Sequence, residues 1–215
     1  MHTEAIDHFS DIAAEWDSNA TRVGIAQTVA HHIDALLGER GADRLLDFGC
    51  GTGLVSLFLY DLIKAHIVAA DTSPAMLAEL EKKIAAQQLE RIEPRQLQTE
   101  RDVGTWQDRF DLVASSMTFH HIKDTRGLVQ GLYHVLQPGG HIAIADLDQE
   151  DGNFHPAGEG VAHYGFARDA LAEIFSEAGF KNVQFTTVYE VEREADPERD
   201  LSARHYPVFL LVAEK

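Results

Sequence analysis

The sequence contains a single cysteine, six prolines and far fewer basic than acidic residues. Cys50 has no partner for a disulfide within the chain, so we expect a cytoplasmic protein. Eighteen Lys and Arg against 35 Asp and Glu give a formal net charge of −17, which disfavours nucleic acid and anionic membrane surfaces as partners. The longest apolar run, residues 54–60, is too short to span a bilayer, and residues 1–10 have no signal-peptide pattern.

The remaining composition is that of one folded domain. Hydrophobic residues make up 45% of the 215 positions and charged residues 25%, which is enough apolar material for a buried core. Sixteen glycines and six prolines are too few for a collagen-like or low-complexity chain. No internal repeat and no linker rich in Pro, Gly or Ser divides the sequence, so we expect a single unit.

Helix and strand patterns alternate along the first two thirds of the chain. A helix is predicted over residues 25–37, because Ile25, Val29 and Ile33 share one stripe. Strands are then predicted at 44–48, 66–71, 92–98, 110–116 and 141–147, and helices at 54–63, 73–87 and 125–136. Strands that alternate with helices predict a parallel sheet covered on both faces, and right-handed crossovers make it a doubly wound α/β sheet.

The pattern changes after residue 147. A polar loop over 148–160 precedes a predicted helix over 166–179. Two further strands are predicted at 183–192 and 206–214, and the charged segment between them is a poor candidate for a crossover helix. We therefore expect an antiparallel strand pair at the edge of the sheet.

The most informative segment is LLDFGCGTG at residues 45–53, in which three glycines alternate directly after a buried strand and before a helix. Glycine permits positive φ and close approach of a ligand, and ligands bind at the carboxyl ends of strands in open α/β sheets. No lysine follows as in a phosphate loop, and Leu54 stands where a dinucleotide fingerprint has its third glycine. The simpler alternative is a tight turn between strand and helix.

Asp71 ends the next predicted strand. A carboxylate at this place can accept both hydroxyls of a ribose that lies across the first strand. Its alternative role is to cap the following helix, but Ser73 and Pro74 already supply the N-cap and the first helical position. Asp71 is therefore expected to be free for a ligand.

Four segments in this order, LDFGCGTG, VAADTSPAML, FDLVASSMTFHHIKD and LYHVLQPGGHIAIAD, resemble the class I S-adenosylmethionine-dependent methyltransferases. The resemblance covers residues 44–146 and implies a Rossmann-like seven-stranded sheet, mostly parallel with a reversed last strand. It implies one methyltransferase domain over residues 1–215. Its parts would be an N-terminal helical lid at 1–40, a cofactor-binding core at 42–147, an acceptor loop at 148–165, and a closing helix and strand pair at 166–215.

The resemblance also implies S-adenosyl-L-methionine as cofactor and assigns residues to it. The glycine loop would hold the methionine end, Asp71 the ribose, Met76 the apolar side of the adenosine, and Glu100 or Asp102, with Asp102 favoured, the adenine amino group. Thr72 is a further candidate for contact with the cofactor. Ser115 and Ser116 would lie where the methionine part meets the acceptor, and Trp16 would belong to the lid, although packing alone also explains it. The matching loop residues are Asp47, Gly49, Cys50, Gly51 and Gly53.

The candidates for chemistry and for acceptor binding follow the fourth and fifth predicted strands. A neutral imidazole of His120 or His121 can take a proton from a hydroxyl or amine acceptor, and a structural hydrogen-bonding role is the alternative. The loop at 148–165 falls where the family builds its acceptor pocket, although it is alternatively a lid packed by its own aromatic side chains. The acceptor candidates in it are Phe154, His155, His163 and Tyr164.

The same loop and the end of the strand before it also contain possible metal ligands. They are the crowded Asp146, Asp148, Glu150, Asp151, His155 and His163. Their spacing matches no defined metal motif, so we expect a solvated acidic loop and no metal.

The sequence therefore predicts transfer of a methyl group from S-adenosylmethionine to a small-molecule acceptor by direct displacement. The alternatives are a catalytically silent cofactor-binding partner and an NAD(P)-dependent reductase on the same architecture. Nucleic-acid methylation is further disfavoured because SSMT at residues 115–118 replaces an Asn/Asp-Pro-Pro-aromatic segment. Protein acceptors stay open, and the sequence sets neither the accepting atom nor the oligomeric state.

Overall fold

Seven strands form one mixed sheet in the order β3-β2-β1-β4-β5-β7-β6. The computed structural model describes residues 9–107, 109–155, 160–193 and 203–215. The strands are β1 (Ala42–Phe48), β2 (Ile63–Asp71), β3 (Ile92–Gln96), β4 (Phe110–Ser116), β5 (Leu136–Leu147), β6 (Lys181–Arg193) and β7 (Arg204–Glu214). β1 to β5 pair in parallel, whereas β7 runs antiparallel to both β5 and β6, so the predicted fold class and the reversed last strand are confirmed.

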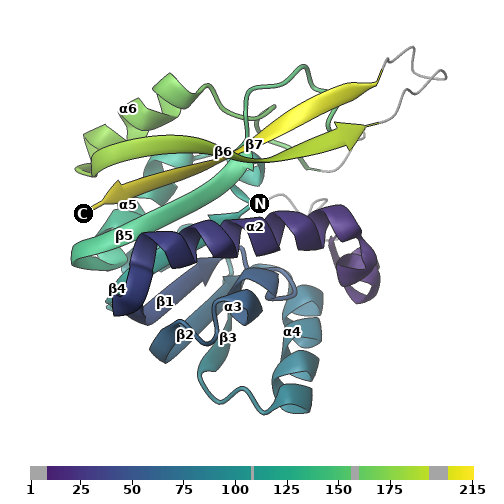
Figure 1. Cartoon of the computed structure of the whole chain (residues 1–215), viewed down its shortest axis with the longest axis vertical. Coiled ribbons are helices and arrows are strands. Elements are labelled where there is room, and N and C mark those ends of the chain that lie inside the picture. Colours follow the sequence, from purple (N-terminus) through teal and green to yellow (C-terminus); the bar gives the residue numbers. More distant parts are fainter. Residues whose placement is uncertain (1–8, 108, 156–159, 194–202) are drawn as a thin grey trace.

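Helices cover both faces of this sheet, and α2 crosses one of them in Figure 1. The α-helices are α2 (Ala20–Leu37), α3 (Leu54–Phe58), α4 (Pro74–Gln87), α5 (Thr125–Val135) and α6 (Arg168–Ala178). Short 3-10 helices are η1 (Ala13–Ser18), η2 (Gly38–Arg40), η3 (Asp102–Thr105) and η4 (Phe119–His121). Among the described residues, no helix is both long and apolar enough to cross a membrane.

Alternation along the central strands divides the core into two layers. Leu45 of β1 packs with buried residues of α2, α3 and α4, whereas its neighbour Leu46 packs with those of α5 and α6. In β5, Ala143 likewise packs in the first layer and Ile144 in the second. Both faces of these strands are therefore buried, which explains their nearly continuous apolar sequences.

The helix predicted over residues 54–63 is wrong in its second half. α3 ends at Phe58, and β2 begins at Ile63, where Ile63 pairs with Ala42 of β1. Leu59 and Ile63 are fully buried on either side of the turn, and both of their N–H groups donate to carbonyls of the preceding turn. The apolar run is consistent with a helix locally, but pairing with β1 determines where the strand starts.

The sheet topology places a ligand site at one edge. From β1 the chain proceeds outward to β2 and β3, and it then returns to lay β4 and β5 on the other side of β1. The carboxyl ends of β1 and β4 therefore lie at the point where the strand order reverses, which is where open α/β sheets bind ligands. The glycine loop follows β1 and η4 follows β4 at this edge.

Candidate active site

A cavity of about 520 Å³ opens at this edge of the sheet. Its wall is formed by the glycine loop, the end of β2, η1, α2, the residues after β4 and the ends of β6 and β7. The volume is within the range of small-molecule sites, which is about 300–1,000 Å³. One continuous space thus joins the predicted cofactor loop to the predicted catalytic and acceptor residues.

The three loop glycines have different surroundings. Gly49, Gly51 and Gly53 all have positive φ, of 70°, 53° and 83°. A Cβ on Gly49 would clash with Thr118, and one on Gly53 would clash with Leu80, so these two glycines permit close packing within the protein. A Cβ on Gly51 would have only Met76 Sδ within reach, at 4.0 Å, so Gly51 leaves open space on the cavity side.

The carboxylate of Asp71 fixes the shape of the loop. One oxygen accepts a hydrogen bond from Gly51 N–H and the other from Ser73 N–H, each at 2.8 Å. Ser73 caps α4 through its hydroxyl, which accepts from Met76 N–H, as predicted. The expectation that Asp71 is free was wrong, because both of its oxygens already accept backbone donors, although a carboxylate has about four acceptor positions in all.

Asp47 is a second buried acid at the cavity wall, with 1% of its surface exposed. One of its oxygens accepts from both the N–H and the hydroxyl of Ser56 in α3, at 3.1 and 2.7 Å. Burial raises the pKa of Asp47 to about 6, against the lowering effect of the Ser56 hydrogen bonds, and nearby Asp71 adds to the rise. Burial likewise raises the pKa of Asp71.

The N-terminal segment closes the cavity from one side. Asp17 accepts from Thr52 Oγ at 2.6 Å and forms an ion pair with Lys83 of α4, which ties η1 to the glycine loop. Trp16 lines the cavity, and the guanidinium of Arg22 lies 3.8 Å from the centroid of its ring. Phe9 contacts Trp16 edge to face and also lines the cavity.

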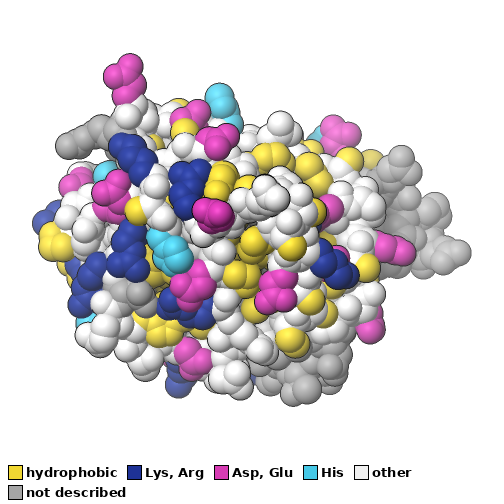
Figure 2. Space-filling view, turned by 90° about the horizontal axis from the view of Figure 1, so that it is seen from below, with side chains coloured by type: hydrophobic (Ala, Val, Ile, Leu, Met, Phe, Trp, Pro, Cys, Tyr) yellow, Lys and Arg dark blue, Asp and Glu magenta, His cyan; other side chains and the backbone are white. Residues whose placement is uncertain are grey.

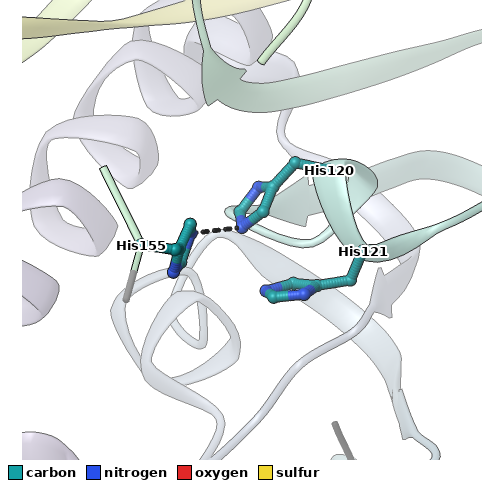
Figure 3. Close-up of side chains that lie close together, drawn as sticks. All are labelled: His120, His121 and His155. Carbon is teal, nitrogen blue, oxygen red and sulfur yellow. Dashed lines mark hydrogen bonds between the residues drawn. The ribbon is translucent and has the colours of Figure 1, made fainter. Parts of the chain in front are cut away.

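Three histidines meet at the other end of the cavity (Figure 3). Asp146, fully buried at the end of β5, lies 2.7 Å from His120 Nδ1 and accepts from the backbone N–H of His120 and Leu147. His120 Nε2 lies 3.0 Å from His155 Nε2. The ring of His121 lies 4.2 Å from that of His120 and 5.5 Å from that of His155, centroid to centroid.

Met117 joins β4 to this cluster with a backbone conformation that is unusual for its side chain. Its φ is +54°, and its N–H donates to Ala145 of β5 at 2.8 Å. Residues held at positive φ without being glycine are found preferentially at functional sites. Here the conformation turns the chain from β4 towards η4, where His120 and His121 lie.

The structure brings twelve of the predicted site residues to the cavity wall. They are Trp16, Asp47, Gly49, Cys50, Gly51, Asp71, Met76, Ser116, His120, His121, Phe154 and His155. Cys50 is buried, and burial raises the pKa of its thiol, which agrees with a space-filling role.

Seven predicted residues do not line the cavity. They are Gly53, Thr72, Glu100, Asp102, Ser115, His163 and Tyr164. Asp102 accepts from Gln98 N–H and Thr99 N–H in the turn before η3. The roles assigned to these seven stay predictions, and the geometry gives them no support.

Ser115, His163 and Tyr164 lie outside the cavity lining for different reasons. Ser115 follows Ala114, which packs against the α2–α4 layer, so alternation directs Ser115 to the opposite face. Its hydroxyl has no hydrogen-bond partner among the described residues. His163 Nε2 lies 2.9 Å from the carbonyl oxygen of Ile122, and Tyr164 is 61% exposed.

The carboxylates of the loop after β5 either pair with arginines or accept hydrogen bonds from backbone N–H groups of the loop. Asp148 forms two hydrogen bonds with Arg168 at 2.7 Å, and Asp151 forms an ion pair with Arg204. Glu150 accepts from backbone N–H groups of residues 152–154. Asp148, Glu150 and Asp151 are thus held by arginines and by backbone donors.

Sequence reasoning missed the wall contributed by β6 and β7. Val191, Glu192, Arg193, Arg204 and Tyr206 line the cavity, and the Tyr206 ring lies 5.3 Å from that of Phe154. The sequence pattern of two edge strands determines neither their register nor the loops that they face. The contribution of β6 and β7 to the cavity wall could therefore not be predicted from it.

A model of the methyltransferase domain family matches residues 45–140, from β1 into β5. Residues 45–140 thus match a methyltransferase domain, and the similar proteins support the class I S-adenosylmethionine-dependent type. It is 34% identical over 154 residues to an uncharacterized methyltransferase of Schizosaccharomyces pombe, and 28% identical over 151 residues to a malonyl-[acyl-carrier protein] O-methyltransferase of Bacillus anthracis. These alignments cover 65% and 66% of this chain, but only 54% and 52% of the relatives, so the chain spans about half their length.

The fold of the methyltransferase is also that of a solved relative. Phosphoethanolamine N-methyltransferase 2 of Haemonchus contortus, in complex with S-adenosyl-L-methionine, superposes with a TM-score of 0.67 at 16% identity. The superposition covers 96% of this chain and 60% of that one. S-adenosylmethionine is the cofactor of the family, and the cavity wall that leaves open space at Gly51 also carries the buried acids Asp47 and Asp71, which fits a cationic ligand of that kind.

We expect Gly51→Ala to weaken binding of S-adenosylhomocysteine at least about tenfold, equivalent to about 1.4 kcal/mol, because the added Cβ would occupy space in the cavity. Gly139→Ala is the matched control. Gly139 has a φ of +77° and nothing within 4 Å of an added Cβ, and it lies outside the cavity lining. Both variants should lose similar stability in thermal unfolding, whereas calorimetry should find the affinity lost only at Gly51. Wild-type affinity in Gly51→Ala would contradict the assignment.

We expect a pH dependence from Asp47. Its pKa in the folded chain, about 6, lies above the ordinary value of 3.8, so the native state binds the extra proton between these values. The cofactor-free protein should therefore lose stability as the pH rises through about 4 to 6, and affinity for S-adenosylmethionine should rise over the same range.

Asp47→Asn provides the comparison for this effect. The variant should be more stable than the wild type at pH 7 without cofactor, and it should bind S-adenosylmethionine more weakly with a flatter pH profile. Thermal unfolding and calorimetry at pH 5, 6 and 7 measure both. Parallel pH profiles for the two proteins would show that Asp47 is not the titrating group.

Proposed function

We propose that this protein transfers a methyl group from S-adenosylmethionine to a small-molecule acceptor that carries an anionic group. The observation that carries the proposal is the single cavity shared by the glycine loop and the histidines after β4. When bound, the cofactor supplies a methyl group that its sulfonium already activates. The chain then has to hold the two reactants in line and exclude water.

The residues available for the cofactor end are Gly51, Met76, Asp47 and Asp71. Gly51 leaves space for close approach, Met76 supplies an apolar side, and the two carboxylates favour a cation. Trp16, held in η1 by the Asp17 contacts, covers this end. The arrangement supports a closed site from which bulk water is displaced on binding.

The acceptor end differs in charge and shape. Phe154, His155 and Tyr206 provide aromatic surface, and Arg193 adds positive charge, whereas Arg204 is already paired with Asp151. Arg193 donates to the carbonyl oxygen of Phe154 at 3.4 Å and also lies over its ring, so its contact there is with a neutral group. A guanidinium on the cavity wall favours a carboxylate or phosphate.

Two similarities agree with an acceptor that carries an acid. The name of the Bacillus anthracis relative specifies a malonyl group borne by an acyl-carrier protein, and that of the Haemonchus contortus protein specifies phosphoethanolamine; these groups carry a carboxylate and a phosphate. The net charge of −17 argues against a nucleic-acid acceptor, and on the face drawn in Figure 2 basic side chains are interspersed with acidic ones.

The proposal is tested by incubating the purified protein with methyl-labelled S-adenosylmethionine and fractionated metabolite pools. We expect label to appear in an anion-exchange fraction of low molecular mass, together with S-adenosylhomocysteine. Cofactor binding without transfer to any fraction would instead favour the catalytically silent binding protein. Label in protein or nucleic acid alone would contradict the acceptor class.

Arg193→Gln tests the anionic group directly. Loss of a charge-assisted hydrogen bond costs about 1.5–3 kcal/mol, so KM for the acceptor should rise at least about tenfold while cofactor affinity stays within a few-fold. Arg126→Gln is the control, because Arg126 pairs with Glu177 away from the cavity. The rise in KM should vanish for an acceptor analogue in which an amide replaces the acid. An equal rise in KM for the acidic acceptor and for its amide analogue would show that Arg193 does not bind the anionic group.

A further inference from the structure

We propose that His120, His121 and His155 bind one divalent transition-metal ion, of the zinc class, at the acceptor end of the cavity. The three side chains come from two segments, η4 after β4 and the loop after β5. One ring nitrogen of each lies within 4.8 Å of the others, and Figure 3 shows the rings gathered around a common space.

The donor set selects the class of metal. Three imidazoles without a carboxylate suit zinc, copper, nickel or cobalt, whereas magnesium and calcium require oxygen ligands. Three protein ligands and one open position are typical of zinc sites that act on a substrate. All three histidines line the cavity, so a fourth position would face the space meant for the acceptor.

Asp146 prepares His120 for this role. Its carboxylate can only accept, so His120 Nδ1, 2.7 Å away, carries the proton and Nε2 presents a lone pair to the cavity. The carboxylate is itself held by two backbone N–H groups and is fully buried. A carboxylate behind the distal nitrogen of a metal-binding histidine fixes its tautomer and orientation.

The spacing is close to that of a metal site. In a tetrahedral zinc site the ligand nitrogens lie about 3.4 Å apart, given zinc–nitrogen bonds of about 2.0–2.1 Å. His120 Nε2 and His155 Nε2 lie 3.0 Å apart, and the two pairs that involve His121 lie within 4.8 Å. Rotation of the His121 ring or of the half-buried His155 would bring these pairs to the spacing of a zinc site. Without metal, His155 Nε2–H donates to His120 Nε2; with metal, His155 carries its proton on Nδ1 instead.

A proton relay from His155 through His120 to Asp146 is the competing use of the same residues. It requires two rings and gives His121 no part. His121 is nevertheless 5% exposed, lies against His120, and approaches the carbonyl oxygen of Gly160 through Nδ1 at 3.4 Å. A metal site accounts for all three rings, because one ring nitrogen of His121 also lies within 4.8 Å of those of His120 and His155.

The role of the ion rests on the proposed function, whereas its binding does not. A zinc-class ion beside the methyl donor would hold a carboxylate, hydroxyl, amine or thiol of the acceptor and lower its pKa as a Lewis acid. Arg193, on the wall near Phe154, would then engage a second acidic group of the same acceptor.

The experiment measures metal binding by the untagged full chain after treatment with a chelator. Zn²⁺ is titrated in competition with a chromophoric chelator, and Co²⁺ is titrated while its visible absorption is recorded. We expect one equivalent of either ion with micromolar or tighter affinity, and Co²⁺ bands typical of four-coordinate nitrogen ligation. His121→Gln and His155→Gln should each lower Zn²⁺ affinity at least about tenfold, and Asp146→Asn about 10–100-fold.

His163→Gln is the matched control, because His163 lies in the same loop but contacts Ile122 and Thr125 outside the cluster. It should bind Zn²⁺ as the wild type does. Absence of stoichiometric binding by the wild type, or wild-type affinity in both His121→Gln and His155→Gln, would overturn the metal site. Loss of binding only in His155→Gln would overturn the three-histidine assignment in favour of the pair.

Binding of S-adenosylhomocysteine is measured on the same samples. A chain that binds S-adenosylhomocysteine but no metal would refute this inference and leave the proposed methyl transfer intact. A chain that binds metal but no S-adenosylhomocysteine would support the metal site and contradict the proposed methyl transfer. The same measurement verifies that each histidine variant is folded, so a lost metal site can be distinguished from a lost structure.

Discussion

The carboxylate of Asp71 holds the cofactor end of the cavity together. Its two oxygens accept from Gly51 N–H and Ser73 N–H, so one side chain at the end of β2 joins the loop after β1 to the start of α4. Removal of it would leave two N–H donors without their acceptor, at a cost of about 1–3 kcal/mol for each that stays buried. The open space beside Gly51 exists because this contact fixes the loop.

The same arrangement leaves the cofactor-free protein with an electrostatic cost. Asp47 and Asp71 are both buried at the cavity wall, and among the described residues neither forms an ion pair. Burial raises the pKa of each, which means that the ionised forms are disfavoured until a positive charge arrives. A cationic ligand offsets this cost, so the buried acids favour S-adenosylmethionine over an anionic dinucleotide.

The features that could be predicted from sequence depend on local patterns. The glycine loop, the N-cap at Ser73 and the strands of the parallel sheet have signatures in neighbouring residues, and the structure confirms them. The end of α3 at Phe58 depends on where β2 pairs with β1, which no local pattern encodes. His155 stood among acidic neighbours in the sequence, yet its ring lies with His120, while Asp151 pairs with Arg204.

The difference between the features that could be predicted from the sequence and those that could not has a structural cause, which also bears on function. The proposed cofactor end is built at the ends of adjacent parallel strands, whose positions are set by the sheet. The proposed acceptor end is built from η4, the loop after β5 and the β6–β7 pair, and these segments meet only through tertiary contacts. Side chains on such segments can change without disturbing the glycine loop. One fold can therefore keep its cofactor while its acceptor varies, and the identity of the acceptor must be determined from the histidine and arginine end of the cavity.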